Sequence, residues 1–468
     1  MALSASTVWE VRFDGSDNNG GGFVSGGSGT DRSQQAAAHA TLTTASTVHT
    51  TTTQINVAVG DYTVTSLDVD NILQITGGTA TAGFYRITAA DVPNNRWTVD
   101  RSAGTAGQTV AGAMGGALAS PGKAMGAKVA SNTIWWKLSA STYDITTTTA
   151  NVSGGRVDAN AANLRVEGYE TTRGDLSTNR PTLKATVNTM TMFTESSGAG
   201  VFGNFILNTG SATAITPITT GAATTTHRVK AINGKTTASF NCSSGSFLLL
   251  CGATGGTVPG FRMNGATLAG CVATGMSTFG FESASSVNTC VGCIADEITA
   301  GNPGFTNTGA TARLWAINCT SYGHAGGGGS HGFSNAVTAY SMSQVNCIAD
   351  TNAGTGVGAS NATTAFNCIG RNNATAFGPN CVQFGSVTLT GDPFTSSGAN
   401  DFSLNNNAGA GADARGTGLP GAFPDVTSTT GYIDIGAAQH QDTVAEVEAV
   451  TNSRHVLLTL PRTWIIEN

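Results

Sequence analysis

A short apolar segment built around one small residue, usually cysteine, recurs along the second half of this chain. The anchors of its seven copies are Ala231, Cys251, Cys271, Cys293, Cys319, Cys347 and Cys368. Successive anchors are 20, 20, 22, 26, 28 and 21 residues apart. A second track follows each cysteine by 9 to 14 residues and consists of Phe261, Phe281, Phe305, Phe333, Val357 and Phe377. Constant anchors at elastic spacing are typical of a solenoid, in which each repeat is a coil stacked on its neighbours.

The two tracks predict two strands per coil, with the anchor side chains pointing into a narrow core. Segments such as VNCIA alternate small apolar with polar residues, which is the pattern of a strand buried on one face. Strands stack about 4.8 Å apart while turns can bulge freely, so variable spacing favours short strands with elastic loops. We therefore expect an all-β chain whose main part, from about Trp135, is a right-handed, single-stranded parallel β-helix. Asn318, Asn346 and Asn367 precede three of the cysteines, and their amides are expected to stack along the axis.

The nine cysteines are interpreted as buried thiols rather than as disulfides or metal ligands. Nine is an odd number, and the only C-x-x-C pair, Cys290 and Cys293, has no second pair at a zinc-site distance. A buried free cysteine behaves as a small hydrophobic residue that suits a narrow core. We expect no metal and no cofactor.

Composition excludes several classes of protein. Charged residues make up 11% of the chain and the formal net charge is −6, with no run of basic residues. A nucleic-acid partner is therefore not expected. The first 13 residues lack the basic and apolar stretches of a secretory signal, and nowhere do 18 apolar residues follow one another. These features predict no membrane insertion and synthesis in a reducing cytoplasm without a signal peptide.

Four regions are predicted along the chain. Residues 1–49 form the N-terminal strand and cap of the β-helix, and residues 50–122 form a small inserted β-rich module of about five strands separated by Gly, Asn and Pro turns. Residues 123–438 form the parallel β-helix. Residues 439–468 form a C-terminal tail whose apolar stretches, VLLTL and TWII, are expected to serve attachment or oligomerisation.

Three segments carry a resemblance to known families. WEVRFDGSDNNGGGF, residues 9–23, resembles the opening of pectate-lyase-like β-helix proteins, and YIDIGAAQ, residues 432–439, resembles their closing coil. VEGYETTRGDLSTNRPTL, residues 166–183, resembles β-helix proteins encoded by tailed bacteriophages and their prophages. The resemblance implies the fold and leaves the activity open, because lyases, hydrolases, tailspikes and passive structural parts share it.

The resemblance implies that an enzyme of this kind would carry carboxylates on the outer face of consecutive coils. Only eight charged residues occur between residues 251 and 400. Asp296 and Asp350 occupy the same coil position, with Tyr322 between them and Glu297 beside the first, which makes these three carboxylates weak catalytic candidates. Two strand spacings are about 9.6 Å, near the separation of an inverting pair. Solvated surface charge is the preferred interpretation of the carboxylates.

Three other motifs are given structural interpretations. His324 and His331 flank the loop AGGGGS and are interpreted as part of a polar loop tip. The tripeptide Arg173-Gly174-Asp175 is interpreted as a turn. Of Trp135 and Trp136, which could stack on sugars if exposed, alternation requires at least one to point inward.

These observations favour a structural virion protein of a tailed bacteriophage. We expect a rigid β-helical spike, fibre or decoration, made in the host bacterial cytoplasm and forming a homotrimer. It would join other virion proteins through the tail or the 50–122 module, with host-surface polysaccharide as a further contact. The alternative is a tailspike depolymerase, a polysaccharide lyase or glycoside hydrolase with its site near Asp296 and Asp350. Enzymatic activity is left open, with a non-enzyme preferred.

Overall fold

A computed structural model describes most of the chain: residues 3–195, 198–299, 301–326, 329–337, 342–360, 363–386, 389–399, 401–415, 417 and 434–437. The chain forms two compact units, Met1–Arg262 and Met263–Asn468. The boundary between them falls within the predicted 123–438 region, and each unit is described by itself. The predicted tail, 439–468, lies outside the described residues. No helix among the described residues is long and apolar enough to span a bilayer.

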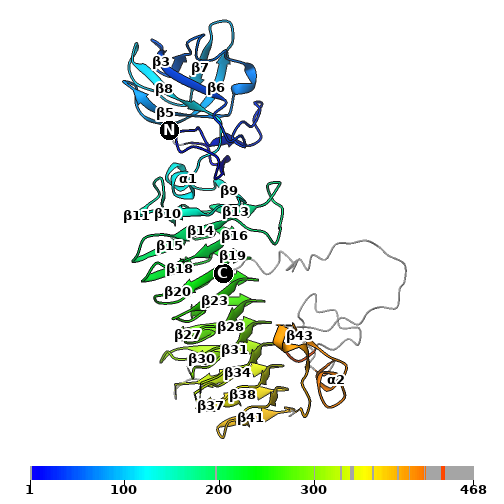
Figure 1. Cartoon of the computed structure of the whole chain (residues 1–468). Helices are drawn as coiled ribbons and strands as arrows, with labels where there is room; N and C mark the ends of the chain where they lie inside the picture. Colours follow the sequence, from blue (N-terminus) through cyan, green and yellow to red (C-terminus); the bar gives the residue numbers. More distant parts are fainter. Residues whose placement is uncertain are drawn as a thin grey trace, which may run out of the picture. The chain divides into compact units, whose positions relative to one another are not determined.

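Three sheets line the solenoid in each unit (Figure 1). Apart from β2, which pairs with β1 in the antiparallel sense, their strands are parallel and follow one another in sequence order. Sheet I in unit 1 consists of β2 (Gly22–Val24), β1 (Thr7–Val11), β9 (Thr133–Lys137), β13 (Arg165–Tyr169), β16 (Val201–Gly203), β19 (Thr225–His227) and β22 (Phe247–Leu249). Sheet I in unit 2 consists of β25 (Thr267–Ala269), β28 (Val287–Val291), β31 (Arg313–Ile317), β34 (Met342–Val345), β38 (Thr363–Phe366) and β41 (Cys381–Phe384).

Sheets II and III complete each coil. Sheet II consists of β10 (Tyr143–Ile145), β14 (Thr182–Ala185), β17 (Ile206–Asn208), β20 (Lys230–Gly234) and β23 (Gly252–Gly256) in unit 1, and of β26 (Val272–Thr274), β29 (Ile294–Asp296), β32 (Thr320–Tyr322), β35 (Ile348–Asp350) and β39 (Ile369–Arg371) in unit 2. Sheet III consists of β11 (Thr147–Ala150), β12 (Gly155–Ala159), β15 (Met190–Glu195), β18 (Ile215–Thr219) and β21 (Phe240–Cys242) in unit 1, of β24 (Phe261–Asn264) at the boundary, and of β27 (Phe281–Ser285), β30 (Phe305–Asn307), β33 (Phe333–Asn335) and β37 (Ala359–Ser360) in unit 2. A separate pair is formed by β36 (Thr355–Val357) and β40 (Thr375–Phe377).

The fold is thus mostly β, with a parallel β-solenoid as its main part. The prediction of two strands per coil was wrong, because each coil has three. The anchor cysteines lie in the turn between sheets I and II, and one residue lies between the end of the sheet I strand and the cysteine. Because only that residue and the cysteine separate the two strands, the sequence reads through the turn as one continuous segment.

That single turn residue has a left-handed backbone conformation in coil after coil. The residues are Asn204, Arg228 and Leu250 in unit 1 and Gly270, Gly292, Asn318, Asn346, Asn367 and Gly385 in unit 2, with φ between 50° and 65°. Their N–H groups donate to the next coil, as Asn318 does to the carbonyl of Val345 at 2.9 Å. The strand after the turn donates back, as Ile348 does to the carbonyl of Cys319 at 2.9 Å. The turn therefore continues the hydrogen-bond ladder from one coil to the next.

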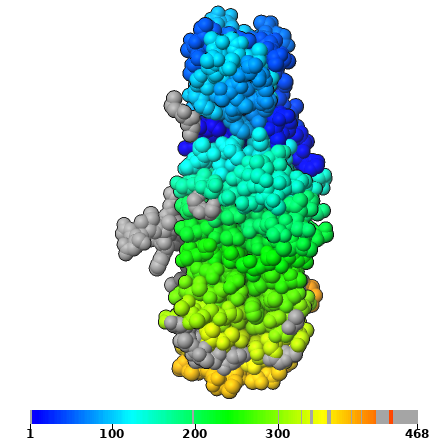
Figure 2. Space-filling view, turned by 90° about the vertical axis from the view of Figure 1, so that its left-hand side faces the viewer, coloured from blue at the N-terminus to red at the C-terminus, as the bar shows by residue number. Residues whose placement is uncertain are grey.

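The core of unit 2 is built from stacked side chains of one kind. The anchor cysteines of this unit, Cys271, Cys293, Cys319, Cys347 and Cys368, are buried thiols that form no disulfide. In sheet III the rings of Phe281 and Phe305 stack with centroids 4.6 Å apart, and those of Phe305 and Phe333 stack at 4.8 Å. Phe377, which the spacing places on the same track, is only half-buried. In unit 1, the rings of Phe240 and Phe261 stack in the same way at 4.6 Å. Successive coils appear as successive colours within each unit (Figure 2).

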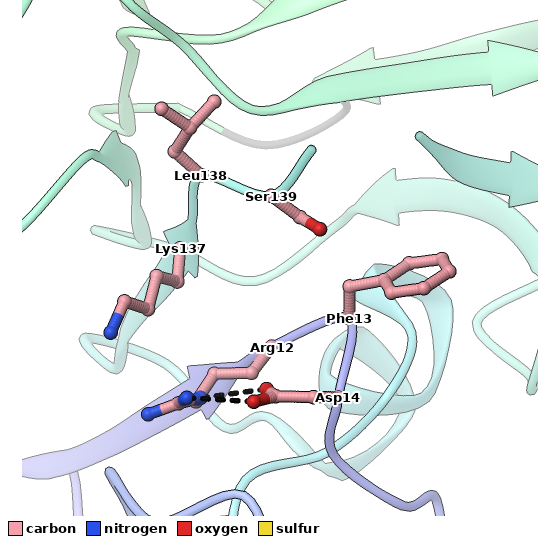
Figure 3. A pocket seen from close by; sticks show the side chains of 6 residues that line it. All are labelled: Arg12, Phe13, Asp14, Lys137, Leu138 and Ser139. Carbon is pink, nitrogen blue, oxygen red and sulfur yellow. Dashed lines mark hydrogen bonds and ion pairs between the residues drawn. The ribbon is translucent and has the colours of Figure 1, made fainter. Parts of the chain in front are cut away.

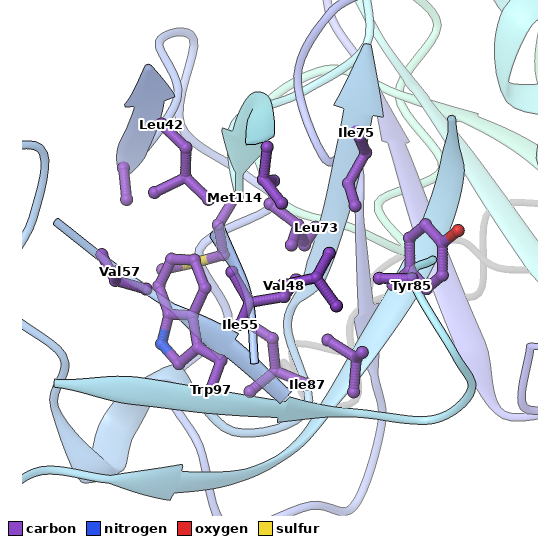
Figure 4. Packing of buried hydrophobic residues seen from close by; sticks show 14 of the residues in the cluster. Leu42, Val48, Ile55, Val57, Leu73, Ile75, Tyr85, Ile87, Trp97 and Met114 are labelled. Carbon is purple, nitrogen blue, oxygen red and sulfur yellow. The ribbon is translucent and has the colours of Figure 1, made fainter. Parts of the chain in front are cut away.

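A closed six-stranded antiparallel barrel is inserted in unit 1 between β2 and β9. Its order is β3 (Ala40–Val48), β4 (Gln54–Asn56), β7 (Arg96–Val99), β6 (Gly83–Asp91), β5 (Ile72–Gly78) and β8 (Thr109–Met114). Trp97, Leu73 and Ile87 fill its core, and the Trp97 indole N–H donates to the buried Asp68 of the short helix η1 (Ser66–Asp68) at 3.0 Å (Figure 4). The barrel begins ten residues before the predicted start at residue 50, because β3 is mostly Thr, Ser and Ala and reads as a loop. The helix α1 (Pro121–Ala127) then leads into the coils and packs against β12.

The last described part of unit 2 lies over the outer face of sheet II. It contains β42 (Phe394–Ser396), η2 (Ser397–Ala399), β43 (Asp401–Leu404) and α2 (Gly411–Ala414). Phe394, Phe402 and Ile435 bury Ile348 and Ile369, two outward side chains of sheet II. This segment is called the C-terminal cover below.

The left-handed turn predicts a stabilising substitution. Leu250 holds φ at 53° and is 49% exposed, so it carries the backbone penalty of a branched-chain residue with little burial in return. Leu250→Gly should raise the free energy of unfolding by about 0.5–1 kcal/mol. The adjacent Leu249→Gly, in β22, should lower it by roughly the same amount. Chemical denaturation of both variants tests this, and equal effects would contradict the role of the turn.

Candidate functional site

The sequence-predicted carboxylates lie on the outer face of sheet II in unit 2. Asp296 is in register with Tyr322, and Tyr322 with Asp350, as the spacing predicted. Their interpretation as solvated surface charges was wrong, because Asp296 is 1% and Asp350 0% exposed. Glu297 is exposed and occupies a second left-handed turn, with φ of 48°.

The C-terminal cover packs on Tyr322, which lies between the two carboxylates in register. The ring of Tyr322 packs edge-on against Phe394 and Phe402, with centroids 5.9 and 5.4 Å apart. Arg371 donates to Asp350 at 2.6 Å, although burial still raises the pKa of this carboxyl. Asp296 has no hydrogen-bond partner among the described residues, and burial raises its pKa to about 7. The two carboxylates are therefore not exposed together on a surface that a polymeric substrate could reach.

His324 is also buried, so its interpretation as part of a polar loop tip was wrong. Its Nδ1 accepts the N–H of Ile298 at 3.1 Å, and its Nε2 is 2.7 Å from the Ser321 hydroxyl. Burial lowers its pKa to about 3, which keeps the ring neutral. Asn352 follows at the same turn position in the next coil, and its side chain donates to Asn373 at 2.9 Å. His331 accepts the N–H of Thr355 at 2.9 Å, so both rings serve the coil-to-coil ladder.

Arg173-Gly174-Asp175 forms a turn, as predicted. The Asp175 carboxylate accepts the backbone N–H groups of residues 170, 171 and 172 at 2.7–2.9 Å. Arg173 donates to Glu10 at 2.7 Å and to Asp31 at 2.8 Å, which ties the loop to the N-terminal strand. Burial raises the pKa of Glu10, and Arg173 opposes that rise. The Arg173 guanidinium is thus bonded to carboxylates of the same chain and is not presented to a receptor.

A group that the sequence analysis did not bring together lies on the outer face of sheet I in unit 1. Registers place Glu10, Trp135, Glu167, Gly203 and His227 opposite one another on successive strands. The residue before each of them is buried and points inward, so these positions point outward. Five coils thus contribute one residue each to a single row.

Gly203 allows a side-chain bond that skips one coil. The Nε2 of His227 lies 2.8 Å from the Glu167 carboxylate, two strands away. The imidazole passes over Gly203, where a Cβ atom would lie 2.3 Å from that same nitrogen. Glu167 is 3% exposed and His227 18%. A buried carboxylate hydrogen-bonded to a reachable imidazole is an arrangement that can transfer protons.

Trp135 and Arg165 lie beside this pair, and two further cations, Lys137 and Arg12, lie farther along, at the end of β9 and directly after β1. Arg165 is 52% exposed, contacts Glu167 at 3.3 Å, and places its guanidinium 5.6 Å from the Trp135 ring centre. The half-buried Trp135 also meets Tyr169 edge-on at 6.1 Å. Lys137, two residues along the same strand face, lines a hollow of about 160 Å³ with Arg12, and Arg12 is itself bonded twice to Asp14 at 2.9 Å (Figure 3). Arg12 also lowers the pKa of Asp14.

The row could not be assembled from the sequence because Glu10 precedes Trp135 by 125 residues and the later members follow at unequal steps of 32, 36 and 24 residues. Trp135 was identified as a candidate for sugar stacking, and Trp136 is the member of the pair that points inward. The remaining signal was weak: a Glu, a Gly and a His, each following an alternating apolar segment. No cluster of three or more His, Cys, Asp or Glu side chains suited to a metal ion occurs in the described part of the chain.

No protein-family model and no curated protein matches the sequence. Among solved structures, the chain is similar to pectate lyase Pel9A, with a TM-score of 0.45 and 12% identity over 69% of this chain and 92% of that one. It is similar to Geobacillus virus E2 ORF18, with a TM-score of 0.30 and 11% identity over 55% and 52% of the two chains. The Azotobacter vinelandii mannuronan C-5 epimerase AlgE6 A-module gives a TM-score of 0.26 and 10% identity over 56% and 91%. The likeness concerns the β-helix fold.

The coil-skipping bond predicts an unusual sensitivity of Gly203. Gly203→Ala should displace His227 and lower the free energy of unfolding by about 1–3 kcal/mol. Gly252→Ala, whose Cβ would meet Lys230 at an ordinary 3.8 Å, is the matched control and should cost much less. In a His227→Ala background the cost of Gly203→Ala should largely disappear. A cost that persists there would place the clash elsewhere.

Proposed function

We propose that this chain is a rigid β-helical structural component of a tailed-bacteriophage particle, a spike, fibre or decoration that contacts host-surface polysaccharide. The observation that carries the proposal is the outer face of sheet I in unit 1, where a half-buried Trp135 lies between the cations of Arg165 and Lys137. Large rigid aromatic rings beside charged groups suit the apolar faces and polar rims of sugar rings. The two cations favour an acidic polysaccharide.

Several features support the assignment to a particle. Continuous hydrogen bonding through strands and turns gives each unit a stiff backbone, which suits a protein that acts outside a cell. Nine cysteines that form no disulfide, eight of them buried, suit a chain that is folded in a reducing cytoplasm. The segment at residues 166–183, which resembles phage-encoded β-helix proteins, supplies the strand and loop beside Trp135. In this proposal the chain is a homotrimer, and the barrel of unit 1 or the C-terminal tail joins it to other virion proteins.

Binding to purified host polysaccharide tests the contact face. Trp135→Ala should weaken binding about tenfold or more, as loss of a central aromatic contact does. Trp315→Ala is the matched control, because Trp315 is 45% exposed on sheet I of unit 2. Titration calorimetry with capsule and lipopolysaccharide fractions gives the affinities. Unchanged binding by the Trp135 variant, or no binding by the parent protein, would reject the contact.

A second candidate, cleavage of the bound polysaccharide, is favoured by the hydrogen bond between Glu167 and His227. If the chain is a lyase or hydrolase, incubation with host polysaccharide releases unsaturated uronate or reducing ends. Glu167→Gln should then abolish product formation, while Asp296→Asn should leave it unchanged because Asp296 is buried. Loss of activity in the Asp296 variant alone would return the site to sheet II.

A further inference from the structure

The outer face of sheet I in unit 2 carries an unbroken row of apolar side chains. Adjacent strands place these residues in register, one from each coil: Ala269, Val291, Ile317, Val345, Phe366 and Phe384. The rings of Phe366 and Phe384 stack with centroids 4.9 Å apart. At about 4.8 Å per strand, the row is roughly 24 Å long. This set of six residues is called the apolar row.

The apolar row is incompletely covered by the described residues. Val291, Ile317, Val345 and Phe366 are half-buried, and Phe384 is 53% exposed. Beside it, on the next outward positions of β31 and β41, Trp315 is 45% and Val382 56% exposed. No charged residue belongs to the row. A contiguous apolar strip of this size on a sheet face is characteristic of a surface that another segment covers.

Residues 436 and 437 of the same chain lie beside the apolar row. The N–H of Gly436 donates to the carbonyl of Asn346 at 2.8 Å, and the N–H of Ala437 donates to the Thr320 hydroxyl at 3.0 Å. The carbonyl of Ala437 lies 3.9 Å from the position of a Cβ on Gly292. Asn346 and Gly292 are the turn residues that directly follow Val345 and Val291. At residue 437, therefore, the backbone is one residue away from two members of the row.

Residues 438–468 follow from that point, and they are long enough and apolar enough to cover the row. Thirty-one extended residues span about 100 Å, several times the length of the row. They include the stretch Val456–Leu460 and the group Trp464–Ile466, separated by Pro461. Burying large aliphatic and aromatic side chains of this kind stabilises by about 1.5–3 kcal/mol each.

We propose that residues 438–468 of the same chain pack against the apolar row, with Val456–Leu460 and Trp464–Ile466 as the contacting segments. The tail is then a part of the folded unit and not a free attachment arm. Attachment to other particle proteins consequently falls to the barrel of unit 1. The experiment must exclude two other possible occupants of the apolar row, a second copy of the chain and another virion protein.

Photo-crosslinking of the full chain identifies the occupant. p-Benzoylphenylalanine replaces Phe384 in one variant and Phe13, 49% exposed in unit 1, in the control. Irradiation of the Phe384 variant should give a product of monomer mass whose crosslinked peptide lies within residues 438–468. A product of dimer mass, or a crosslink to any other segment, would overturn the proposal. Equal crosslinking of the tail by the control would also overturn it.

Limited proteolysis supplies a second measurement. Trypsin can cut the tail at Arg454 and Arg462. Val345→Glu places a charge in the apolar row and should speed both cleavages at least tenfold. Ser343→Glu changes the neighbouring outward side chain of the same strand, β34, and should leave the rates near those of the parent. Equal rates for all three proteins would overturn the proposal, and thermal unfolding verifies that each variant is folded.

Discussion

The structure depends on backbone hydrogen bonds that pass from coil to coil without interruption at the bend between sheets I and II. A parallel solenoid must turn sharply and still pair every buried N–H and C=O group, because an unpaired one costs as much as a lost hydrogen bond. A single left-handed residue makes the sharp turn, and its N–H group still donates to the next coil, as that of Asn318 does. Asn and Gly occupy most of these positions, since they adopt that conformation at the lowest cost. The left-handed turn directs the side chain of the following residue, usually the anchor cysteine, into the core. The stack of thiols follows from the repetition of this turn.

The sequence predicted the parts of the fold that repeat. Cysteine and phenylalanine recur because each coil presents the same small space, so an anchor visible in one coil is visible in all. The third strand was missed because only one residue, such as Asn318 or Gly292, separates it from the anchor. The barrel was placed ten residues late because β3 has only two large apolar side chains, Leu42 and Val48, to mark its inward face.

The candidate site was less predictable, for two physical reasons. Tyr322, which lies between Asp296 and Asp350 in register, packs against Phe394 and Phe402, and these two residues belong to a non-repeating segment farther along the chain. The row of Trp135, Glu167 and His227 depends on the register between coils of unequal length. Register follows from the whole stack and not from any local pattern. The core residues of a solenoid can thus be predicted from its repeating sequence, whereas the groups of residues on its outer faces cannot.

The bond between His227 and Glu167 has a consequence for how the chain avoids stacking errors. Coils with nearly identical turns and anchors could pair one coil out of step and still satisfy most of their backbone groups. A contact that reaches across an intervening glycine can form only when three particular coils are in their correct order. The His324, Asn352 and Asn373 side chains distinguish neighbouring coils inside unit 2 in a similar way. The few irregular polar residues of this chain thus specify which coil stacks on which, and they give a repetitive molecule one native alignment.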